Sequence, residues 1–316
     1  EGHKDFEIKA DHRLPIEKDL ERRDFTINAI AQDMEGNLID PFNGQQDLKA
    51  GEIKITYPKS FEDDALRMLR AVRFASVLGF NIDPETYKLI KESADKFSTI
   101  ANDRVQTEFT KIAEQGDAKK GAFLLKDTGI LREMGVDAPQ LVSNVWDNVN
   151  TLAEFVYLLS HNAMSPLKFY MNNMRGDNDI VNELEGLIIG MSAEGNDNPV
   201  INRSVAHNMI TKDKTGNSLQ SKILPEKLQI AAQELLQGKY PKDRKDLAIN
   251  GHDIMEKGLK GEEIGKMERA LLINVYADKV RNTREDLLAL LDERKEDVKE
   301  GYDYYSEPQN TWRVNG

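Results

Sequence analysis

Apolar residues recur at helical spacing from about Ser60 to near the end of the chain, and this pattern predicts packed helices over most of the length. The first helix of this stretch has the best-defined limits. Ser60 can cap its N-terminus, with Asp63 three residues later, and Gly79 can end it. Its apolar stripe consists of Leu66, Leu69, Val72, Phe74 and Val77. The spacing therefore predicts one continuous helix from near Ser60 to Gly79.

The N-terminal residues 1–50 show a different, mixed pattern. Turn-forming residues at 34–37 precede a short apolar run at 37–40, and a second short run lies at 52–55. These features predict a turn and two short strands. The expected fold class is therefore an α+β segment followed by mostly α-helical domains.

Charge and composition exclude several classes of protein. The formal net charge of −12 argues against a general nucleic-acid coat protein, because phosphate binding needs Lys and Arg, but it permits a local basic patch. The chain has no Cys, which excludes disulfides, thiol catalysis and Cys-ligated zinc and is compatible with the cytoplasmic location that we expect. No apolar run approaches the roughly 20 residues that span a membrane, so no membrane partner is expected.

The segment from Arg22 to Ala31, with the sequence RRDFTINAIA, places two Arg, an Asp and an Asn next to apolar residues. Charges in such a place cost free energy unless they are paired or bind a ligand. One interpretation is a nucleotide cradle, in which Arg contacts phosphate and Asn contacts the sugar hydroxyls. The other interpretation is the solvated start of a helix, and the residues alone do not decide between the two.

A row of charged residues with a spacing of three follows, formed by Asp64, Arg67, Arg70 and Arg73, which share a face if they lie on one helix. Such a row can be a set of ordinary ion pairs, each worth about a few tenths of a kcal/mol. Alternatively, Asp64 and Arg67 can read a nucleobase. A carboxylate only accepts hydrogen bonds and a guanidinium only donates them, which matches the amino group and ring nitrogen of cytosine and adenine. Guanine and uracil present the reversed pattern.

Four motifs together resemble those of class II nucleotidyltransferases, the family of CCA-adding enzymes and bacterial poly(A) polymerases. The motifs are RRDFTINA at 22–29, Asp40-Pro41-Phe42-Asn43-Gly44 with Asp47-Leu48, the run from Asp63 to Phe74 with Ala65 in place of the usual Pro, and Asn102-Asp103-Arg104-Val105 with Glu108. The resemblance covers residues 15–135 well and 240–292 moderately. It implies the remnant of a nucleotidyltransferase head domain at 1–50, a helical neck that binds the base at 51–116, a helical body at 117–238 and a helical tail at 239–316.

The resemblance also implies roles for individual residues. Phosphate and ribose contacts would come from Arg23, Asp24 and Asn28, and the base-reading template from Asp64 and Arg67. Arg70 and Arg73 are further nucleotide-binding candidates. Each could form a structural ion pair or contact phosphate, and the sequence leaves both roles open. A hinge-like element between head and neck would include Asp40 and Gly44. The template helix would be braced from the neighbouring helix by Arg104 and Glu108.

Glycine-rich turns between 247 and 265 resemble the tail of bacterial CCA-adding enzymes, which contacts tRNA. Glycines at helix starts expose backbone N–H groups that favour phosphate, and Lys257, Lys260 and Lys266 lie nearby. Simple turns between helices are the alternative. The expected tail is an RNA-binding unit in which these three lysines contact phosphates.

The family's metal-binding Asp-x-Asp strand has no counterpart in residues 1–50. Its carboxylates would hold two Mg²⁺ ions for attack of the RNA 3′-hydroxyl on the α-phosphate. The Asp-x-Asp at 177–179 follows Gly176 far along the chain and predicts a loop or helix start, whereas Asp11 is a candidate auxiliary carboxylate. The metal ligands are therefore unassigned. Because the chain begins EGHKDFEIK, without an initiator Met, we interpret its start as an internal cut and expect an upstream segment or polypeptide to supply them.

Three functions follow from these features. The first is transfer of CMP and AMP from CTP and ATP to the 3′ end of tRNA, adding CCA or part of it, by an enzyme of which this chain is an N-terminally incomplete form, inactive alone. The second is a bacterial poly(A) polymerase. The third is a non-catalytic RNA- or nucleotide-binding subunit of a split enzyme. The glycine-rich tail favours the first over the second.

Overall fold

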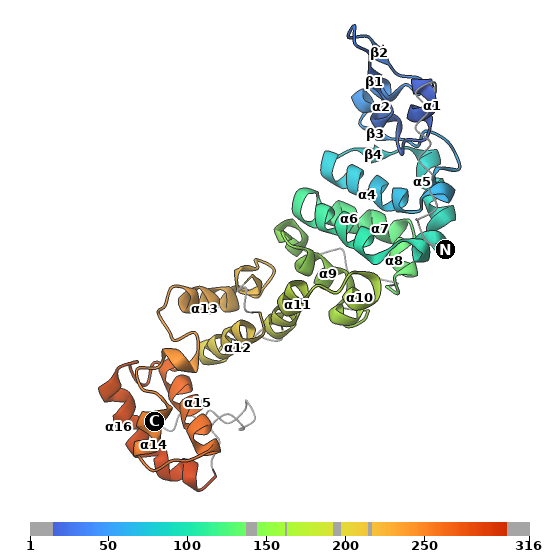
Figure 1. The fold of residues 1–316 in the computed structure, drawn as a ribbon. Coiled ribbons are helices and arrows are strands. Elements are labelled where there is room, and N and C mark those ends of the chain that lie inside the picture. Colours follow the sequence, from blue (N-terminus) through green and yellow to red (C-terminus); the bar gives the residue numbers. More distant parts are fainter. Residues whose placement is uncertain (1–14, 137–143, 162, 192–196, 214–216, 302–316) are drawn as a thin grey trace. The chain divides into compact units, whose positions relative to one another are not determined.

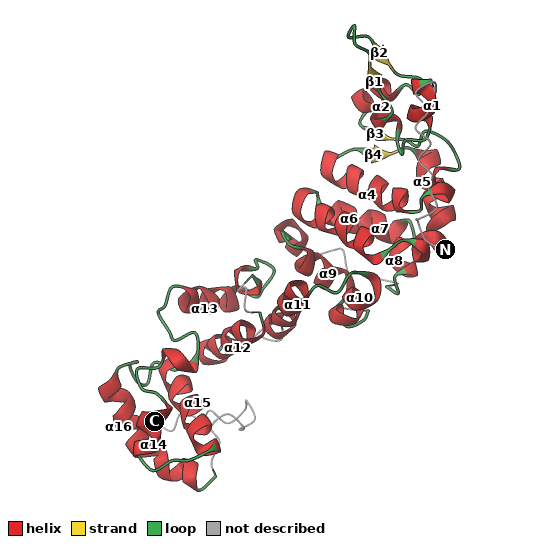
Figure 2. Cartoon of the chain, in the orientation of Figure 1, coloured by secondary structure: helices red, strands yellow, loops and turns green. Residues whose placement is uncertain are grey.

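The computed structural model describes residues 15–136, 144–161, 163–191, 197–213 and 217–301 (Figure 1). The chain divides into two compact units, Glu1–Gly176 and Asp177–Gly316. Helices dominate both units, and the strands of the described residues are short and lie in the first unit (Figure 2). The expected fold class, an α+β segment followed by helical domains, is thus confirmed. The boundaries at 50, 116 and 238 stay predictions.

The N-terminal part of the first unit combines short helices with short strands. Its elements are α1 (Ile16–Glu21), the 3₁₀ helix η1 (Thr26–Asn28), β1 (Ala31–Gln32), β2 (Leu38–Ile39), α2 (Gly44–Ala50) and β3 (Glu52–Ile53). β1 and β2 form an antiparallel pair, and β3 pairs in parallel with β4 (Asn81–Ile82). The turn predicted at 34–37 and the strands predicted at 37–40 and 52–55 are confirmed, although each strand covers only two residues.

The rest of the first unit is helical. Its helices are α3 (Ser60–Asp63), α4 (Leu66–Leu78), α5 (Pro84–Ser93), η2 (Ala94–Thr99), α6 (Asn102–Gln115), α7 (Ala118–Asp127), α8 (Ile130–Glu133), η3 (Asn144–Asn148), α9 (Leu152–Ser160) and α10 (Pro166–Asn173). α4 packs against both α6 and α7, so it lies at the centre of this group.

The prediction of one helix from Ser60 to Gly79 is wrong, because the chain breaks between α3 and α4. Asp64 has an extended backbone, with φ −149° and ψ 102°, and Ala65 follows with φ −59°. The Asp64 carboxylate supports the break by accepting a hydrogen bond from the Leu66 amide (3.1 Å). The apolar spacing continues through the break, so periodicity alone did not reveal it. Gly79 ends α4 as predicted, with a left-handed φ of 72°.

The buried face of α4 holds the N-terminal segment in place. Met68, Leu69 and Val72 are fully buried on this helix, and Phe25 is fully buried in the segment before η1. The rings of Phe25 and Phe74 meet edge to face, with centroids 5.7 Å apart. This aromatic contact fixes residues 22–28 beside the helix that carries the row of arginines.

The second unit is helical throughout its described residues. Its helices are α11 (Asn178–Met191), α12 (Pro199–Lys212), η4 (Ser218–Gln220), α13 (Glu226–Leu236), η5 (Arg244–Asp246), α14 (Gly251–Glu256), α15 (Glu262–Tyr276) and α16 (Arg284–Lys299). Arg203 of α12 is buried within this unit. Its guanidinium pairs with Glu234 (2.9 Å) and Asp278 (3.1 Å) and lies 3.9 Å from the ring centroid of Tyr240. The ion pairs and the aromatic ring together compensate for the buried charge.

Candidate functional site

A cleft of about 510 Å³ opens on the first unit, where the segment before η1 meets the start of α4. We call it the arginine cleft. Its lining residues are Arg22, Arg23, Asp24, Asn28, Asp64, Leu66, Arg67, Arg70, Phe74 and Arg104. Every nucleotide-binding candidate predicted from the sequence lines this cleft except Arg73. Five guanidinium groups stand against two carboxylates, which leaves three positive charges in excess and makes the cleft suited to an anion.

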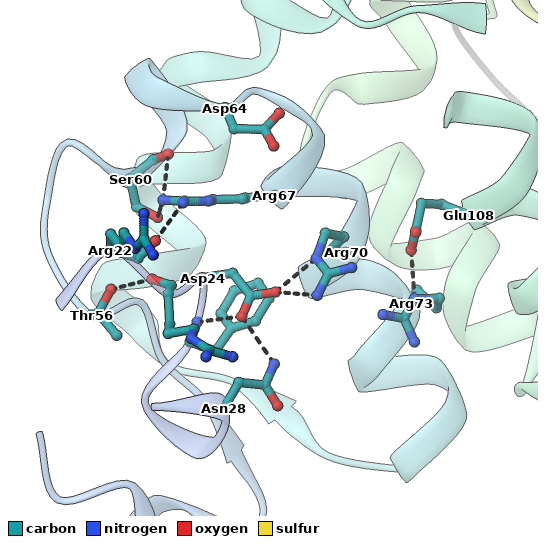
Figure 3. A network of polar contacts seen from close by, with 12 residues as sticks. Arg22, Asp24, Asn28, Thr56, Ser60, Asp64, Arg67, Arg70, Arg73 and Glu108 are labelled. Carbon is teal, nitrogen blue, oxygen red and sulfur yellow. Dashed lines mark hydrogen bonds and ion pairs between the residues drawn. The ribbon is translucent and has the colours of Figure 1, made fainter. Parts of the chain in front are cut away.

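The Asp24 carboxylate organises the lower part of the cleft (Figure 3). Oδ1 accepts hydrogen bonds from the Phe25 amide (2.9 Å) and the Asn28 side chain (3.0 Å). Oδ2 accepts from Arg70 Nε (2.7 Å) and pairs with its Nη2 (2.5 Å). A carboxylate has about four acceptor positions, so these contacts occupy Asp24 completely. Asp24 therefore orients Asn28 and Arg70, and the phosphate or ribose contact expected of it has no acceptor position left.

Arg22 and Arg23 stand at the exposed rim of the cleft. Their side chains are 78% and 53% exposed, and both pair with Asp19 of α1. Exposed pairs of this kind are weak and exchange readily with other anions. These two guanidiniums are therefore the ones most available to a phosphate group.

Arg67 is held by three residues of neighbouring segments. Its Nη1 donates to the Tyr57 hydroxyl (3.0 Å) and to Ser60 Oγ (2.9 Å). Its Nη2 donates to the backbone carbonyl of Arg22 (2.7 Å). Figure 3 shows Arg67 reaching Ser60 and Arg22 while the Asp64 carboxylate lies apart from it.

Asp64 has a different partner, because Arg104 of α6 donates to both of its oxygens at 3.2 Å and 2.9 Å. Burial opposes ionisation of Asp64, but the hydrogen bonds and charge of Arg104 outweigh it, so the pKa of this carboxyl lies below its usual value. The expectation that Asp64 and Arg67 share a helix face is wrong, because Asp64 lies in the break before α4. The two side chains line one cleft without forming an ion pair with each other.

Arg73 points away from the arginine cleft and forms a buried pair with Glu108 of α6. Its Nε donates to Glu108 Oε2 (2.5 Å), and the side chains are 12% and 4% exposed. Its guanidinium also lies 3.8 Å from the ring centroid of Phe74. Of the two options left open for Arg73, this geometry corresponds to structural ion pairing. Arg104 and Glu108 both reach from α6 to the 64–73 segment, as a bracing role requires.

The second sequence motif packs directly against the first. Asp40 accepts hydrogen bonds from the amides of Gly44 (2.7 Å) and Gln45 (2.9 Å), which places its charge at the start of α2. A Cβ at Gly44 would lie 2.1 Å from the Thr26 carbonyl oxygen, so only glycine permits this approach. Asp47 then accepts from the Thr26 hydroxyl (2.7 Å). Residues 40–48 thus pack against η1 through Thr26. The hinge role of Asp40 and Gly44 stays a prediction.

Sequence reasoning missed three contributors to the cleft: the Arg22 carbonyl, Tyr57 and Ser60. Ser60 was assigned only as a helix cap, and Tyr57 carried no pattern. A backbone carbonyl leaves no trace in the sequence. The signal that could have drawn attention to Tyr57 is its position in the turn between two recognised motifs.

The three lysines predicted for the tail lie in the second unit at or near the start of α15. Lys257 pairs with Asp292 of α16 (2.6 Å). Lys260 is exposed and Lys266 is half-exposed, with no ion pair to either among the described residues. The predicted glycine-rich turns are present, with left-handed φ values at Gly258 and Gly261.

The described residues offer no group of three or more His, Cys, Asp or Glu side chains that could hold a metal ion. Asp179 lies in the first turn of α11, so the prediction of a loop or helix start at 177–179 is confirmed. Asp11 falls outside the described residues. No helix within the described ranges is long and apolar enough to cross a membrane.

Comparisons with known proteins agree on one family. Residues 2–54 match the family model described as the poly A polymerase head domain, and residues 79–138 match the probable RNA- and SrmB-binding site of polymerase A. The CCA-adding enzyme of Latilactobacillus sakei is 31% identical over 300 residues, an alignment that covers 86% of this chain and 72% of the relative. A Geobacillus CCA-adding enzyme is 48% identical over 116 residues, covering 36% of this chain and 28% of the relative.

Solved structures show the same similarity. The CCA-adding enzyme of Bacillus stearothermophilus, solved in complex with CTP, has a TM-score of 0.68 at 26% identity, covering 91% of this chain and 76% of that one. The Thermotoga maritima CCA-adding enzyme, solved with tRNA, has a TM-score of 0.62 at 23% identity, covering 87% and 73%. The second likeness concerns the fold alone.

Proposed function

Because the chain belongs to the family of CCA-adding enzymes, we propose that it binds CTP and ATP in the arginine cleft and acts in adding CCA to the 3′ end of tRNA. The relatives named CCA-adding enzyme favour this function over that of a poly(A) polymerase. The protein is a member of a nucleotidyltransferase family, and we propose that it acts in the cytoplasm.

The triphosphate binds at the rim of the cleft in this proposal. Arg22 and Arg23 are exposed and weakly paired, and each can exchange Asp19 for a phosphate oxygen. Arg70 lies deeper and is oriented by Asp24. Asn28 is oriented by the same carboxylate through its amino group, which leaves its carbonyl oxygen as the acceptor for a ribose hydroxyl.

The base is read by Asp64 and Arg67, and one observation carries this assignment. Each side chain is held by other residues and keeps unused hydrogen-bonding capacity at the cleft wall. Asp64 accepts three hydrogen bonds and has room for about one more. A surface ion pair between the two would instead consume both groups. Asp64 therefore accepts from the amino group of cytosine or adenine, and Arg67 donates to the ring nitrogen.

Mg²⁺, which the family resemblance implies, does not fit the carboxylates of the cleft. Asp24 and Asp64 already accept from arginines, and five guanidiniums surround them, so a divalent cation is opposed there. We therefore assign nucleotide binding and base selection to this chain's described residues and derive no transfer step from them.

The proposal is tested by binding of the four nucleoside triphosphates to the wild type, Arg67→Ala and Asp64→Ala. Arg67→Ala should weaken CTP and ATP by about 1–3 kcal/mol, or roughly one to two powers of ten, because the ring nitrogen loses its donor. Asp64→Ala should weaken both and relax rejection of UTP and GTP. Lys91→Ala serves as the control, because Lys91 is an ion-paired cation outside the cleft. Folded variants that keep the wild-type preference for C and A would refute the assignment.

The tail has a separate role in the proposed function. In this proposal Lys260, which is exposed, and Lys266, which is half-exposed, contact RNA phosphate, whereas Lys257 shares its charge with Asp292. The glycine turns at Gly258 and Gly261, together with these lysines, support a tRNA partner for this chain as part of the proposal.

A further inference from the structure

The hydrogen bonds of Arg67 use only part of the hydrogen-bonding capacity of its guanidinium. A guanidinium carries five N–H groups. Both N–H groups of Nη1 are directed to Tyr57 and Ser60, and one of Nη2 is directed to the Arg22 carbonyl. Nε–H and the second Nη2–H have no partner among the described residues. These two donors, which we call the Arg67 fork, remain available at the cleft wall.

We propose that Tyr57 and Ser60 are positioning residues for nucleotide selection, because they hold Nη1 of Arg67 and thereby direct the free donors of its guanidinium toward the base. The inference rests on the proposed function, in which Arg67 reads the base. Neither residue needs to touch the nucleotide. Their effect is to restrict the torsions of a long side chain that otherwise has several rotamers of similar energy.

Tyr57 is itself fixed in one orientation. Its hydroxyl donates to Asp63, so a lone pair of the same oxygen is left for Arg67. Burial and the Asp63 carboxylate outweigh the opposing effect of Arg67 and raise the pKa of Tyr57, so the hydroxyl keeps the proton that it donates. The guanidinium carbon of Arg67 lies 5.9 Å from the centroid of the Tyr57 ring.

The segment that carries Tyr57 is also joined to the phosphate side of the cleft. Thr56 donates from its hydroxyl to the Arg23 carbonyl (2.5 Å), and the Thr26 amide donates to the Lys54 carbonyl (2.9 Å). Ser60 is completely buried, so its hydroxyl is a fixed acceptor. The positions of Arg22, Arg23 and the Arg67 fork are thus set by one short piece of backbone.

The consequence is selective. The fork donates to the ring nitrogen and adjacent carbonyl of cytosine, whereas uracil presents an N–H at the ring position and opposes donor to donor. If Arg67 loses its support, its guanidinium samples other directions, CTP loses affinity, and UTP avoids the opposed contact. A purely structural role for Tyr57 and Ser60 would change stability and leave the ratio of the two affinities unchanged.

The test measures Kd for CTP and UTP on the 316-residue chain, for the wild type, Tyr57→Phe and Ser60→Ala, by equilibrium dialysis with labelled nucleotide. Tyr57→Phe keeps the ring and removes only the hydroxyl. Each variant should lower the ratio of the UTP Kd to the CTP Kd by about three- to tenfold, as the net loss of one typical hydrogen bond predicts. Tyr87→Phe is the matched control, because Tyr87 also donates to an Asp, Asp127, but lies outside the cleft. It should leave the ratio unchanged.

Arg67→Ala distinguishes a failure of the positioning role of Tyr57 and Ser60 from a failure of the proposed function. If Arg67→Ala lowers the ratio while Tyr57→Phe and Ser60→Ala keep the wild-type value, the positioning role is overturned and the proposed function stands. If Arg67→Ala leaves the ratio unchanged, or if the wild type binds CTP and UTP equally, the proposed function fails and the positioning role fails with it. Thermal unfolding of each variant identifies any loss of fold, and Ser60→Ala tests the inference even if Tyr57→Phe is unstable.

Discussion

At the scale of single residues, the arginine cleft uses arginine in two distinct ways. Arg70 and Arg104 bind carboxylates of the chain itself, those of Asp24 and Asp64. Arg22 and Arg23 are exposed, and their pairing with Asp19 is weak. The chain as a whole has a net charge of −12, yet the cleft is positive. The charge that a ligand meets is therefore set by the residues around the cleft and not by the net charge of the chain.

Arg104 should control the protonation of Asp64. The folded chain lowers the pKa of Asp64, so its ion pair stabilises the fold above the usual pKa of Asp, about 3.9, and this stabilisation is lost as the pH falls through the lower folded pKa. Arg104→Gln removes the main opposing effect to burial, and the pKa of Asp64 should rise. A protonated Asp64 can donate to the uracil carbonyl, so rejection of UTP should weaken at low pH.

The measurement for this prediction is the ratio of the UTP Kd to the CTP Kd, taken from about pH 8 to about pH 5.5. The wild-type ratio should stay constant over this range, because Asp64 remains ionised. In Arg104→Gln the ratio should fall with decreasing pH, by up to about tenfold. An equal pH dependence in both proteins would show that Arg104 does not set the charge of Asp64.

At the scale of elements, the sequence predicted a mostly helical chain and most of the charged residues of the cleft, but not the break between α3 and α4. Periodicity indicates which residues face the core. Leu66, Leu69 and Val72 have the same spacing whether the segment is one continuous helix or is broken into α3 and α4. The break depends on the extended backbone of Asp64. The family's usual Pro after this position would have indicated such a backbone, but this chain has Ala65 there. The partners of Arg67 were equally hidden, because hydrogen bonds to a backbone carbonyl depend on tertiary packing.

Ala65→Pro should stabilise this break. Ala65 has φ −59°, close to the value that proline imposes, and Asp64 before it has the extended backbone that proline favours. No hydrogen bond from the Ala65 amide occurs among the described residues. The free energy of unfolding should therefore rise by about 0.5–1 kcal/mol, through a less flexible unfolded chain.

Urea unfolding followed by circular dichroism checks this prediction, with Ala65→Gly as the control at the same position. The glycine variant should shift the midpoint in the opposite direction, because it makes the unfolded chain more flexible. Ala65 is only 8% exposed, so the proline ring must fit a packed site. A lower midpoint for Ala65→Pro would mean that the ring does not fit and that the break is held by the Asp64 side chain alone.

At the scale of the whole molecule, nucleotide selection and RNA binding fall to different units. The arginine cleft lies within Glu1–Gly176, whereas the three tail lysines lie within Asp177–Gly316. Variants in one unit should therefore leave the other property intact. This separation makes the tail testable through its effect on RNA alone.

Lys260→Gln with Lys266→Gln should reduce the salt dependence of tRNA binding. Each phosphate contact releases counterions, and the slope of log K against log salt concentration changes by roughly 0.7–0.9 per contact, so the double variant should lose about 1.4–1.8 from the slope. Lys257→Gln should change it less, because Asp292 already offsets that charge. Lys88→Gln, an exposed lysine of the first unit, is the control. If the double variant keeps the wild-type slope in a filter-binding titration while CTP binding is normal, the tail lysines do not contact phosphate. The glycine turns at Gly258 and Gly261 then serve only to connect helices.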